Sequence, residues 1–313
     1  MTCTLTNVAA FIAILAIPAP VIWSYSGGGL VIAIGLVTIC ARGDWQKARE
    51  FDKLILLGPL FYAAPVAAFG IEHFTQTDAI ASIVPSWMPW HLFWAYFVGA
   101  CFIAAGFSLV TRIQARLSAS LLALTFFLFV VLMDVPGWLQ DPHDRFAFAL
   151  VLRELSFSGG ALALAAGLGE QSSERRSRIL ATIARYFIAI PVLFFAFEQF
   201  RHANYVPAIP LNRLTPEWLF GHAIWTYLAA VAYAVAGIFL LVGKKTRTAA
   251  AWLGFTVLFV ELVAYVPIAI VDRASLGNGF NYLADTLMFC GAILLLASAM
   301  PRESPQRELS GAR

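Results

Sequence analysis

Apolar runs of bilayer length follow one another along almost the whole chain. A transmembrane helix needs about 20 mainly apolar residues, and most of these runs approach or reach that length. Apolar residues make up 60% of the sequence and charged residues 12%. Soluble proteins usually carry about 25% charged residues. The sequence therefore predicts an all-α, polytopic transmembrane bundle, with runs at 5–23, 29–41, 54–74, 90–110, 117–135, 146–168, 186–200, 217–242, 248–267 and 282–300.

The N-terminal part contributes either one or two of these spans. The run 29–41 is shorter than a span, and residues 24–29 before it resemble a tight turn or a flexible break. A re-entrant or tilted 29–41 segment is the alternative. With eight later spans, the total is nine or ten. No Lys or Arg precedes the first run, so it lacks the basic region of a signal peptide and we expect it to stay on the mature protein.

The chain also carries one pattern twice. Residues 54–168 and 186–300 read as two copies of a four-helix hydrophobic unit. Trp94 matches Trp225, and the offset of 131 holds from there onward, whereas it is 126 nearer the start. Since each copy has an even number of spans, the two copies are parallel, related by an axis along the membrane normal. The matched positions include Pro65 and Pro191, Glu72 and Glu198, Gly106 and Gly237, Arg116 and Arg247, Glu154 and Asp285, and Gly160 and Gly291.

These copies divide the chain into five parts. Residues 1–50 hold the N-terminal hydrophobic segment or segments and a basic cytoplasmic loop, and 51–168 hold the first repeat. A polar linker, 169–185, leads to the second repeat at 186–300, and 301–313 form a polar tail.

The Lys and Arg residues predict the orientation. The loops 42–53, 111–116, 169–185 and 243–247 and the tail hold 16 of the 21 Lys and Arg, the opposite loops hold four, and Arg153 lies within a span. Basic residues stay on the cytoplasmic side. The C-terminus is therefore expected in the cytoplasm, and the net charge of +3 reflects topology, not nucleic-acid binding.

Ionisable residues within or beside the spans gather toward the outer side. Glu154 lies roughly 12 Å along its helix from the outer end, and Glu261 roughly 9 Å, at 1.5 Å per residue. Such groups usually face the bundle interior or a wet cavity and pair with one another. The sequence predicts an outer polar pocket formed from Glu72, His73, Asp134, Arg153, Glu154, Glu198, His202, Glu261 and Asp285.

The pairing within this pocket has structural and functional interpretations. Neighbouring side chains on a helix point about 100° apart, so Arg153 and Glu154 are not expected to face each other. Arg153 would take Asp134, Glu72 or Asp285 as its partner, and Glu154 a histidine. Two interpretations of these residues remain: a salt bridge that holds the span in the bundle, or a site that handles protons or a ligand. Glu198 and His202, four residues apart, share a helix face if the helix continues, or snorkel at the interface.

Motifs that carry chemistry are missing. The sequence has no tightly spaced histidine pair, no Cys-x-x-Cys, no phosphate loop, no nucleophile elbow and no dinucleotide fingerprint, so neither a metal site nor catalytic residues are predicted. The Pro- and Trp-rich loop 84–91 forms either a lid over the pocket or part of an aromatic belt at the headgroups.

Each repeat resembles the DoxX-like family of four-helix membrane proteins. The resemblance lies in the segments 70–74 (GIEHF), 84–89 (VPSWMP), 93–97 (FWAYF), 106–109 (GFSL) and 153–160 (RELSFSGG), and Arg116 opens the next helix. The second copy keeps Glu198, Arg247 and Asp285 but lacks the counterparts of His73 and Arg153. If one copy kept chemistry, it is therefore the first.

This resemblance implies a protein of the bacterial cytoplasmic (inner) membrane. Family members are subunits of quinone-linked sulfur oxidoreductases, partners in oxidative-stress complexes, or maturation and cargo-handling proteins. We expect a non-catalytic subunit or assembly factor of a membrane redox or export system, whose partners are the bilayer and a redox subunit. The alternative is a small-molecule- or quinone-binding protein or transporter that uses the outer carboxylate/His pocket, and a free-standing enzyme ranks third.

The orientation can be tested with a reporter that is active only outside the cytoplasm. Fused after Pro142, the reporter should be active, because the loop 136–145 is assigned to the outer side. Fused after Lys245, in a basic loop, it should be silent. Activity after Lys245 with silence after Pro142 would reverse the assignment.

Overall fold

Helices form almost all of the part of the chain that the computed structural model describes, residues 19–169, 174–209, 213–219, 221–271 and 276–302. Within these ranges the only β pairing is an isolated bridge between Tyr205 and Leu214. The helices are α2 (Ala19–Ala41), α3 (Asp44–Lys47), α4 (Asp52–Leu56), α5 (Gly58–Thr75), α6 (Thr77–Ile83), α7 (His91–Thr111), α8 (Ala115–Phe129), η1 (Val130–Asp134), α9 (Val135–Trp138), α10 (Arg145–Gly167), α11 (Glu174–Arg201), α12 (His222–Val242), α13 (Thr246–Val260), η3 (Glu261–Tyr265), α14 (Val266–Val271) and α15 (Leu276–Ala299).

Helix α2 corrects the sequence-based prediction for the N-terminal part. Residues 24–29, which we expected to form a turn or break, lie within this continuous helix, and 29–41 is its second half. In lipid a helix satisfies its own backbone hydrogen bonds, which a break would leave open. Its small residues serve packing: a Cβ on Gly28 would lie 3.3 Å from the Ala64 carbonyl oxygen of α5. The predicted span 5–23 lies largely outside the described residues.

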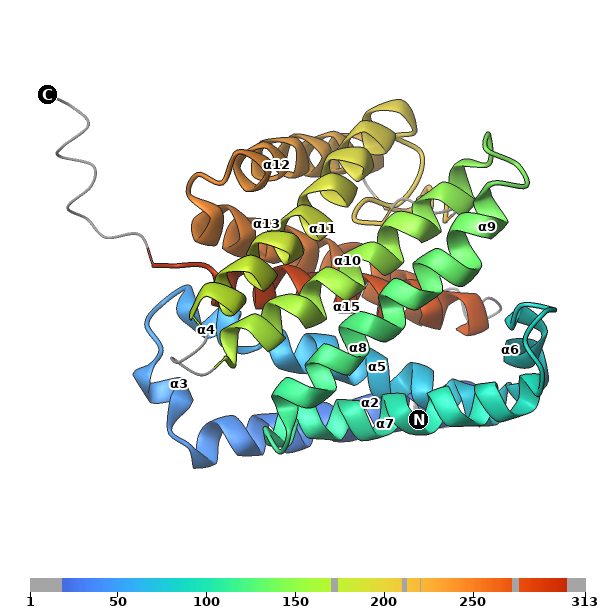
Figure 1. The fold of residues 1–313 in the computed structure, drawn as a ribbon. Helices are drawn as coiled ribbons and strands as arrows, with labels where there is room; N and C mark the ends of the chain where they lie inside the picture. The colour runs from blue at the N-terminus through green and yellow to red at the C-terminus, as the bar shows by residue number, and fades with distance from the viewer. Residues whose placement is uncertain (1–18, 170–173, 210–212, 220, 272–275, 303–313) are drawn as a thin grey trace, which may run out of the picture.

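Nine helices of the described chain are long and apolar enough to cross a membrane. Figure 1 shows α3 and α4 at one end of the bundle and α6 and α9 at the opposite end. Ion pairs join loops at the first end: Asp44 lies 2.8 Å from Arg112, and Asp52 lies 2.6 Å from Arg247 and 3.1 Å from Arg302. Loops that the charge pattern assigns to one side of the membrane therefore meet at one end of the molecule.

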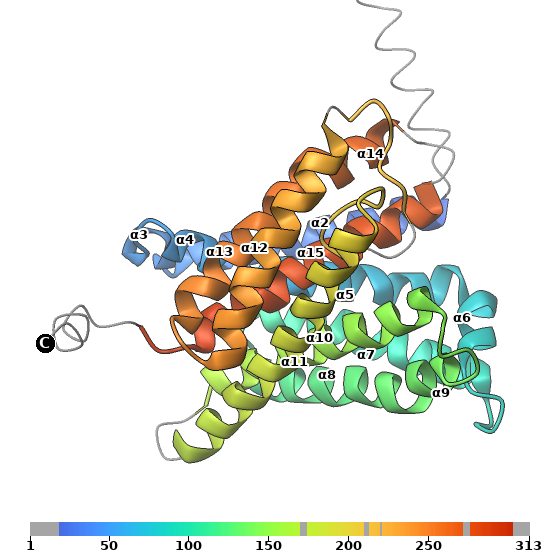
Figure 2. The ribbon, with the colours of Figure 1, turned by 90° about the horizontal axis from the view of Figure 1, so that it is seen from above.

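Helices α10 and α15 cross at the centre of the bundle (Figures 1 and 2). Helix α10 packs against α8, α11 and α15, whereas α15 packs against α5, α10 and α13. Small residues permit these close crossings, as is usual between membrane helices. Gly160 of α10 faces Ala292 of α15, and Gly291 lies against the backbone of Phe61 and Tyr62 in α5. The Tyr62 hydroxyl also donates a 2.7 Å hydrogen bond to the Phe157 carbonyl.

Residues 54–168 and 186–300, here called the first and second halves, have helix boundaries that keep the offset of 131. It relates α7 to α12, α8 to α13, and the π-helical turn η1 to η3, at both their first and last residues. Positive backbone φ angles recur at the same offset, in Trp90 and Gly221, in Arg112 and Gly243, and in Gln114 and Lys245. Backbone features that are rare outside glycine thus occur at matching places.

Because α15 and α5 pack closely where they cross, we expect a larger side chain at this crossing to destabilise the protein. Gly291→Ala should destabilise the protein by about 1–3 kcal/mol, the usual cost of overpacking, because the added methyl group meets backbone atoms that cannot rotate away. The matched control is Gly29→Ala in α2, where nothing lies within 4 Å of the added carbon. Thermal unfolding of both variants in detergent is the measurement. Equal melting temperatures would contradict this packing.

Candidate functional site

Helix α10 carries the charged centre of the site. The Asp144 carboxylate caps its N-terminus by accepting hydrogen bonds from the backbone N–H of Phe146 (2.8 Å) and Ala147 (3.2 Å). An aspartate at this position satisfies backbone donors that the helix leaves open. The cap fixes where the helix that carries Arg153 and Glu154 begins.

Arg153 joins the last long helices of the two halves. Its guanidinium group lies 2.7 Å from an Asp285 carboxylate oxygen on α15 and 2.7 Å from Glu154 Oε1 on its own helix. Asp285 was one of the three partners expected for Arg153. The prediction that Arg153 and Glu154 do not pair is wrong, as is the expected histidine partner for Glu154. The Cβ atoms of adjacent helix residues point in different directions, but the arginine side chain is long enough to reach the carboxylate of Glu154.

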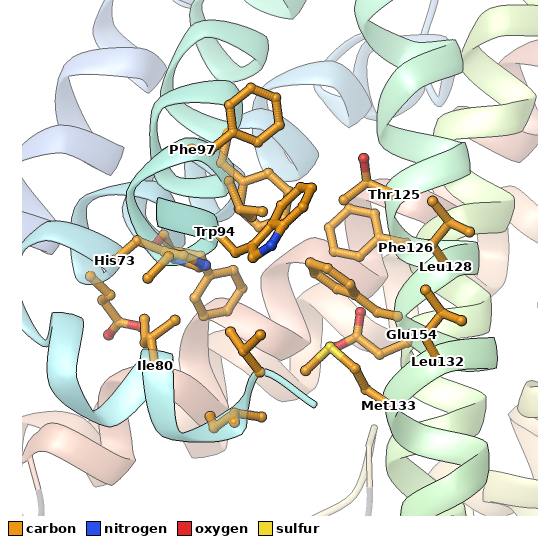
Figure 3. A pocket seen from close by; sticks show the side chains of 18 of the residues that line it. His73, Ile80, Trp94, Phe97, Thr125, Phe126, Leu128, Leu132, Met133 and Glu154 are labelled. Carbon is orange, nitrogen blue, oxygen red and sulfur yellow. The ribbon is translucent and has the colours of Figure 1, made fainter. Parts of the chain in front are cut away.

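A cavity of about 590 Å³ lies beside this ion-pair network. Its walls come from α5, α6, α7, α8, η1, α10 and α15, together with residues of the 84–91 loop. Figure 3 shows His73 and Trp94 on one side of the cavity, Phe126 and Leu132 on the facing side, and the Glu154 carboxyl group directed toward the space between them. Glu154 is 8% exposed, and its Oε2 has no hydrogen-bond partner in the described chain.

Aromatic rings form a connected part of the cavity wall. Phe102 and Phe126 have ring centroids 5.4 Å apart, and Phe126 lies 5.7 Å from Phe157. The Arg153 guanidinium carbon sits 5.8 Å from the centroid of the Phe157 ring, so a cation already occupies one aromatic face. The aromatic residues of the lining are Phe69, Trp94, Phe97, Phe102, Phe126, Phe129 and Phe157.

His73 has a fixed hydrogen-bonding pattern at the cavity wall. Its Nδ1 lies 2.7 Å from the Phe69 carbonyl oxygen, and a carbonyl only accepts hydrogen bonds. Nδ1 therefore carries the proton, which leaves Nε2 of the neutral ring as an acceptor. The ring packs edge-on against Phe102 at 5.6 Å.

The predicted pocket residues separate into three groups: those that line the cavity, those in a second cluster between α10 and α11, and those on the two π-helical turns. The first group lines the cavity and consists of Glu72, His73, Arg153, Glu154 and Asp285. Four others, namely Asp134, Glu198, His202 and Glu261, do not line it, so the single pocket predicted from the sequence is too broad. From the 84–91 loop, Val84, Pro85 and Met88 line the cavity, while Trp87 and Trp90 are exposed.

Glu198 belongs to a second cluster between α10 and α11. Its carboxylate lies 3.2 Å from Arg145 and 3.9 Å from the His202 Nε2. Glu198 and His202 therefore lie close together, although α11 ends at Arg201 and does not continue through His202. Arg145 also stacks over the Tyr205 ring at 4.5 Å. Next to Glu198, the Gln199 side chain is fully buried, and neither of its amide atoms has a partner in the described chain.

The remaining two carboxyl groups lie on the π-helical turns. Asp134 ends η1 and Glu261 begins η3, and π-helical turns occur frequently at functional sites. Glu261 is 3% exposed, and neither carboxyl oxygen has a hydrogen-bond partner among the described residues. One oxygen of Asp134 is likewise buried without a partner there.

A smaller cavity of about 220 Å³ occupies the matching place in the second half, between α12 and α13. Lining residues of the two cavities correspond at the offset of 131, including Trp94 and Trp225, Thr125 and Thr256, and Leu132 and Val263. The described residues around the smaller cavity include no charged side chain. Of these two matching cavities, the first-half cavity is the larger and the one with ionisable lining residues in the described chain.

Several site residues were missed by sequence reasoning. Arg145 was counted only as a loop charge, although it begins α10 and pairs with Glu198. The aromatic residues of the cavity, such as Phe126 and Phe157, look like ordinary membrane-facing residues in an apolar run. Phe157 lies one turn after Glu154 on the same helix, which is a signal that the sequence offers, whereas Phe126 lies on α8 and only the helix packing places it at the cavity.

The fold and site together define a class of protein. The described chain has nine apolar helices of membrane-spanning length, ion pairs at one end of the bundle and an acidic cavity nearer the other, and these features indicate a multi-pass α-helical membrane protein. No group of three His, Cys, Asp or Glu side chains in the described ranges could hold a metal ion. No family model, curated protein or solved structure matches this chain.

Removal of the central cation should destabilise the bundle. Arg153→Gln leaves Asp285 and Glu154 buried without compensation, so we expect a loss of about 3 kcal/mol, typical of a broken buried pair. The control is Arg178→Gln, since Arg178 and Glu174 are 74% and 79% exposed and such pairs contribute about 0–1 kcal/mol. Chemical unfolding in detergent measures both. Equal losses in the two variants would show that the Arg153 network is not buried.

Proposed function

We propose that this protein binds a small amphipathic molecule in the outer cavity of its first half. The observation that carries the proposal is the Glu154 carboxyl group, which is buried, directed into the cavity and left with one oxygen unpartnered. Ligand sites are typically about 300–1,000 Å³ in volume, mainly apolar, with a few convergent polar groups. The cavity of about 590 Å³ has this composition.

The depth of the charged groups also favours binding over a purely structural role. Ionisable residues within membrane spans are costly and commonly mark substrate or ion pathways. A structural ion pair alone needs one acid for Arg153, but the network contains Asp285 and Glu154, and Glu72 lines the same cavity. The additional acidic groups are not needed to pair with Arg153, and they can therefore contact a ligand in the cavity.

We further propose that the chain consists of two DoxX-like four-helix units in parallel orientation. The recurring helix boundaries and positive φ angles support this arrangement. Packing supports it as well: α5, the first helix of one unit, contacts α15, the last helix of the other, and α11 contacts α10 in the same way. In this arrangement the second unit, whose cavity lacks charged lining residues, serves as scaffold.

We also propose that the protein lies in the bacterial cytoplasmic membrane with its C-terminus in the cytoplasm. The cavity would then open toward the outer side, where α6 and the 84–91 loop border it. A role beside a redox or export partner stays a prediction from the family resemblance. It is compatible with binding, since a subunit can supply or hold a small molecule for its partner.

The proposal predicts that filling the cavity abolishes binding. Thr125→Trp should remove saturable binding of ten-carbon amphiphiles (decylamine, decanol or decanoate) and of a short-chain benzoquinone to the protein in lipid nanodiscs. Its matched control is Thr256→Trp in the smaller cavity. Both threonines are half-buried and donate hydrogen bonds to the carbonyl oxygen four residues earlier, at 2.9 and 3.0 Å.

Isothermal titration against empty nanodiscs separates site binding from partition into lipid. We expect at least one of these probes to bind the unmodified protein and Thr256→Trp with equal affinity, and Thr125→Trp to lose that binding. If no probe saturates the protein, or if Thr125→Trp binds as the control does, the cavity is not a binding site.

A further inference from the structure

Acidic groups outnumber basic ones around the first-half cavity. Its charged lining residues are Glu72, Glu154 and Asp285 against the single cation Arg153. Arg153 is already committed, since it forms close ion pairs with both Glu154 and Asp285. Within the membrane such an excess of carboxyl groups is expensive unless a positive charge compensates it.

His73 at this wall adds to the same pattern. Its Nδ1 donates to the Phe69 carbonyl oxygen, so Nε2 is an acceptor when the ring is neutral. The free Oε2 of Glu154 is also an acceptor when the carboxyl group is ionised. A ligand that brings hydrogen-bond donors and positive charge matches these groups, whereas a group that only accepts hydrogen bonds does not.

Aromatic rings supply the rest of the recognition. The faces of aromatic rings attract cations, and cages of such rings bind alkylated ammonium groups. The rings of Phe102, Phe126 and Phe157 form one connected cluster beside Glu154, and Arg153 already lies over Phe157. The remaining apolar wall, including Ile80, Leu128 and Leu132, suits a hydrocarbon body.

We infer that the ligand of this cavity is an amphipathic organic cation, an amine or quaternary ammonium compound whose apolar body lies among the aromatic rings and whose charged head faces Glu154 and Glu72. The inference rests on the proposed function and specifies its ligand class. It distinguishes the two halves as well, because the smaller cavity offers an apolar wall with no charged lining residue in the described chain.

The test compares probes of one length and different charge. Decylamine is a cation at neutral pH, decanol is neutral and decanoate is an anion, and a short-chain benzoquinone represents acceptor-only ligands. We expect the protein in nanodiscs to bind decylamine more tightly than the other three. Glu154→Gln should weaken decylamine binding about ten-fold, the effect of losing one charge-assisted contact of ~1.4 kcal/mol, and should weaken decanol binding by a smaller factor.

A second variant keeps the test decisive if Glu154→Gln does not fold. Glu72 lines the cavity but forms no side-chain hydrogen bond or ion pair within the described chain, so Glu72→Gln removes an ionisable carboxyl group and breaks no such contact. It should also weaken decylamine binding selectively. The control is Glu174→Gln, which alters an exposed carboxylate outside the cavity.

The outcomes separate this inference from the proposed function. If decanol or the benzoquinone binds as tightly as decylamine, or if both cavity variants bind decylamine normally, the cation inference is overturned while the binding site stands. If none of the four probes binds saturably, the binding site and the cation inference fail together.

Discussion

The ion pair between Arg153 and Asp285 is the interaction on which the arrangement of the two halves depends. It joins α10 to α15, the helices that cross at the centre of the bundle, at 2.7 Å. Small residues such as Gly160 and Gly291 bring these helices and α5 close together, but apolar contacts between helices are scarcely stronger than contacts with lipid tails. An ion pair between two helices, formed where water cannot replace either partner, favours one register of the crossing.

The same ion pair produces the asymmetry between the halves. Both halves have a cavity between matching helices, with a tryptophan and a threonine at corresponding positions. In the first half, Arg153 precedes the acidic residue Glu154. In the second half, the residue matched to Arg153 is Ala284, which precedes Asp285. Arg153 makes it possible to bury Glu154 and Asp285 beside the cavity. The second half contributes Asp285 to the first-half cavity and keeps an apolar cavity of its own.

Sequence reasoning correctly predicted the elements that periodicity and composition determine. The apolar runs predicted the helices, and the nine spans of the described chain lie within the expected range. It also placed Glu72, His73, Arg153, Glu154 and Asp285 together, because costly charges in a membrane must share an interior.

The errors arose where the outcome depends on packing. Residues 24–29 resemble a turn in water, but they continue helix α2, where Gly27 and Gly28 lie close to α5. Glu261 was assigned to the pocket by depth alone, and depth does not determine which buried carboxyl groups line the cavity. The Arg153–Glu154 contact depends on rotamers of long side chains, which helix periodicity does not determine.

A double-mutant cycle on Arg153 and Asp285 tests most directly whether this pair holds the two halves together. Unfolding free energies would be measured for the unmodified protein, Arg153→Gln, Asp285→Asn and the double variant in the same detergent. We expect the two single changes to be non-additive, with a coupling energy of roughly 1–3 kcal/mol, as residues in direct contact show. Additive effects would mean that Arg153 and Asp285 do not interact and that the central crossing is wrongly described.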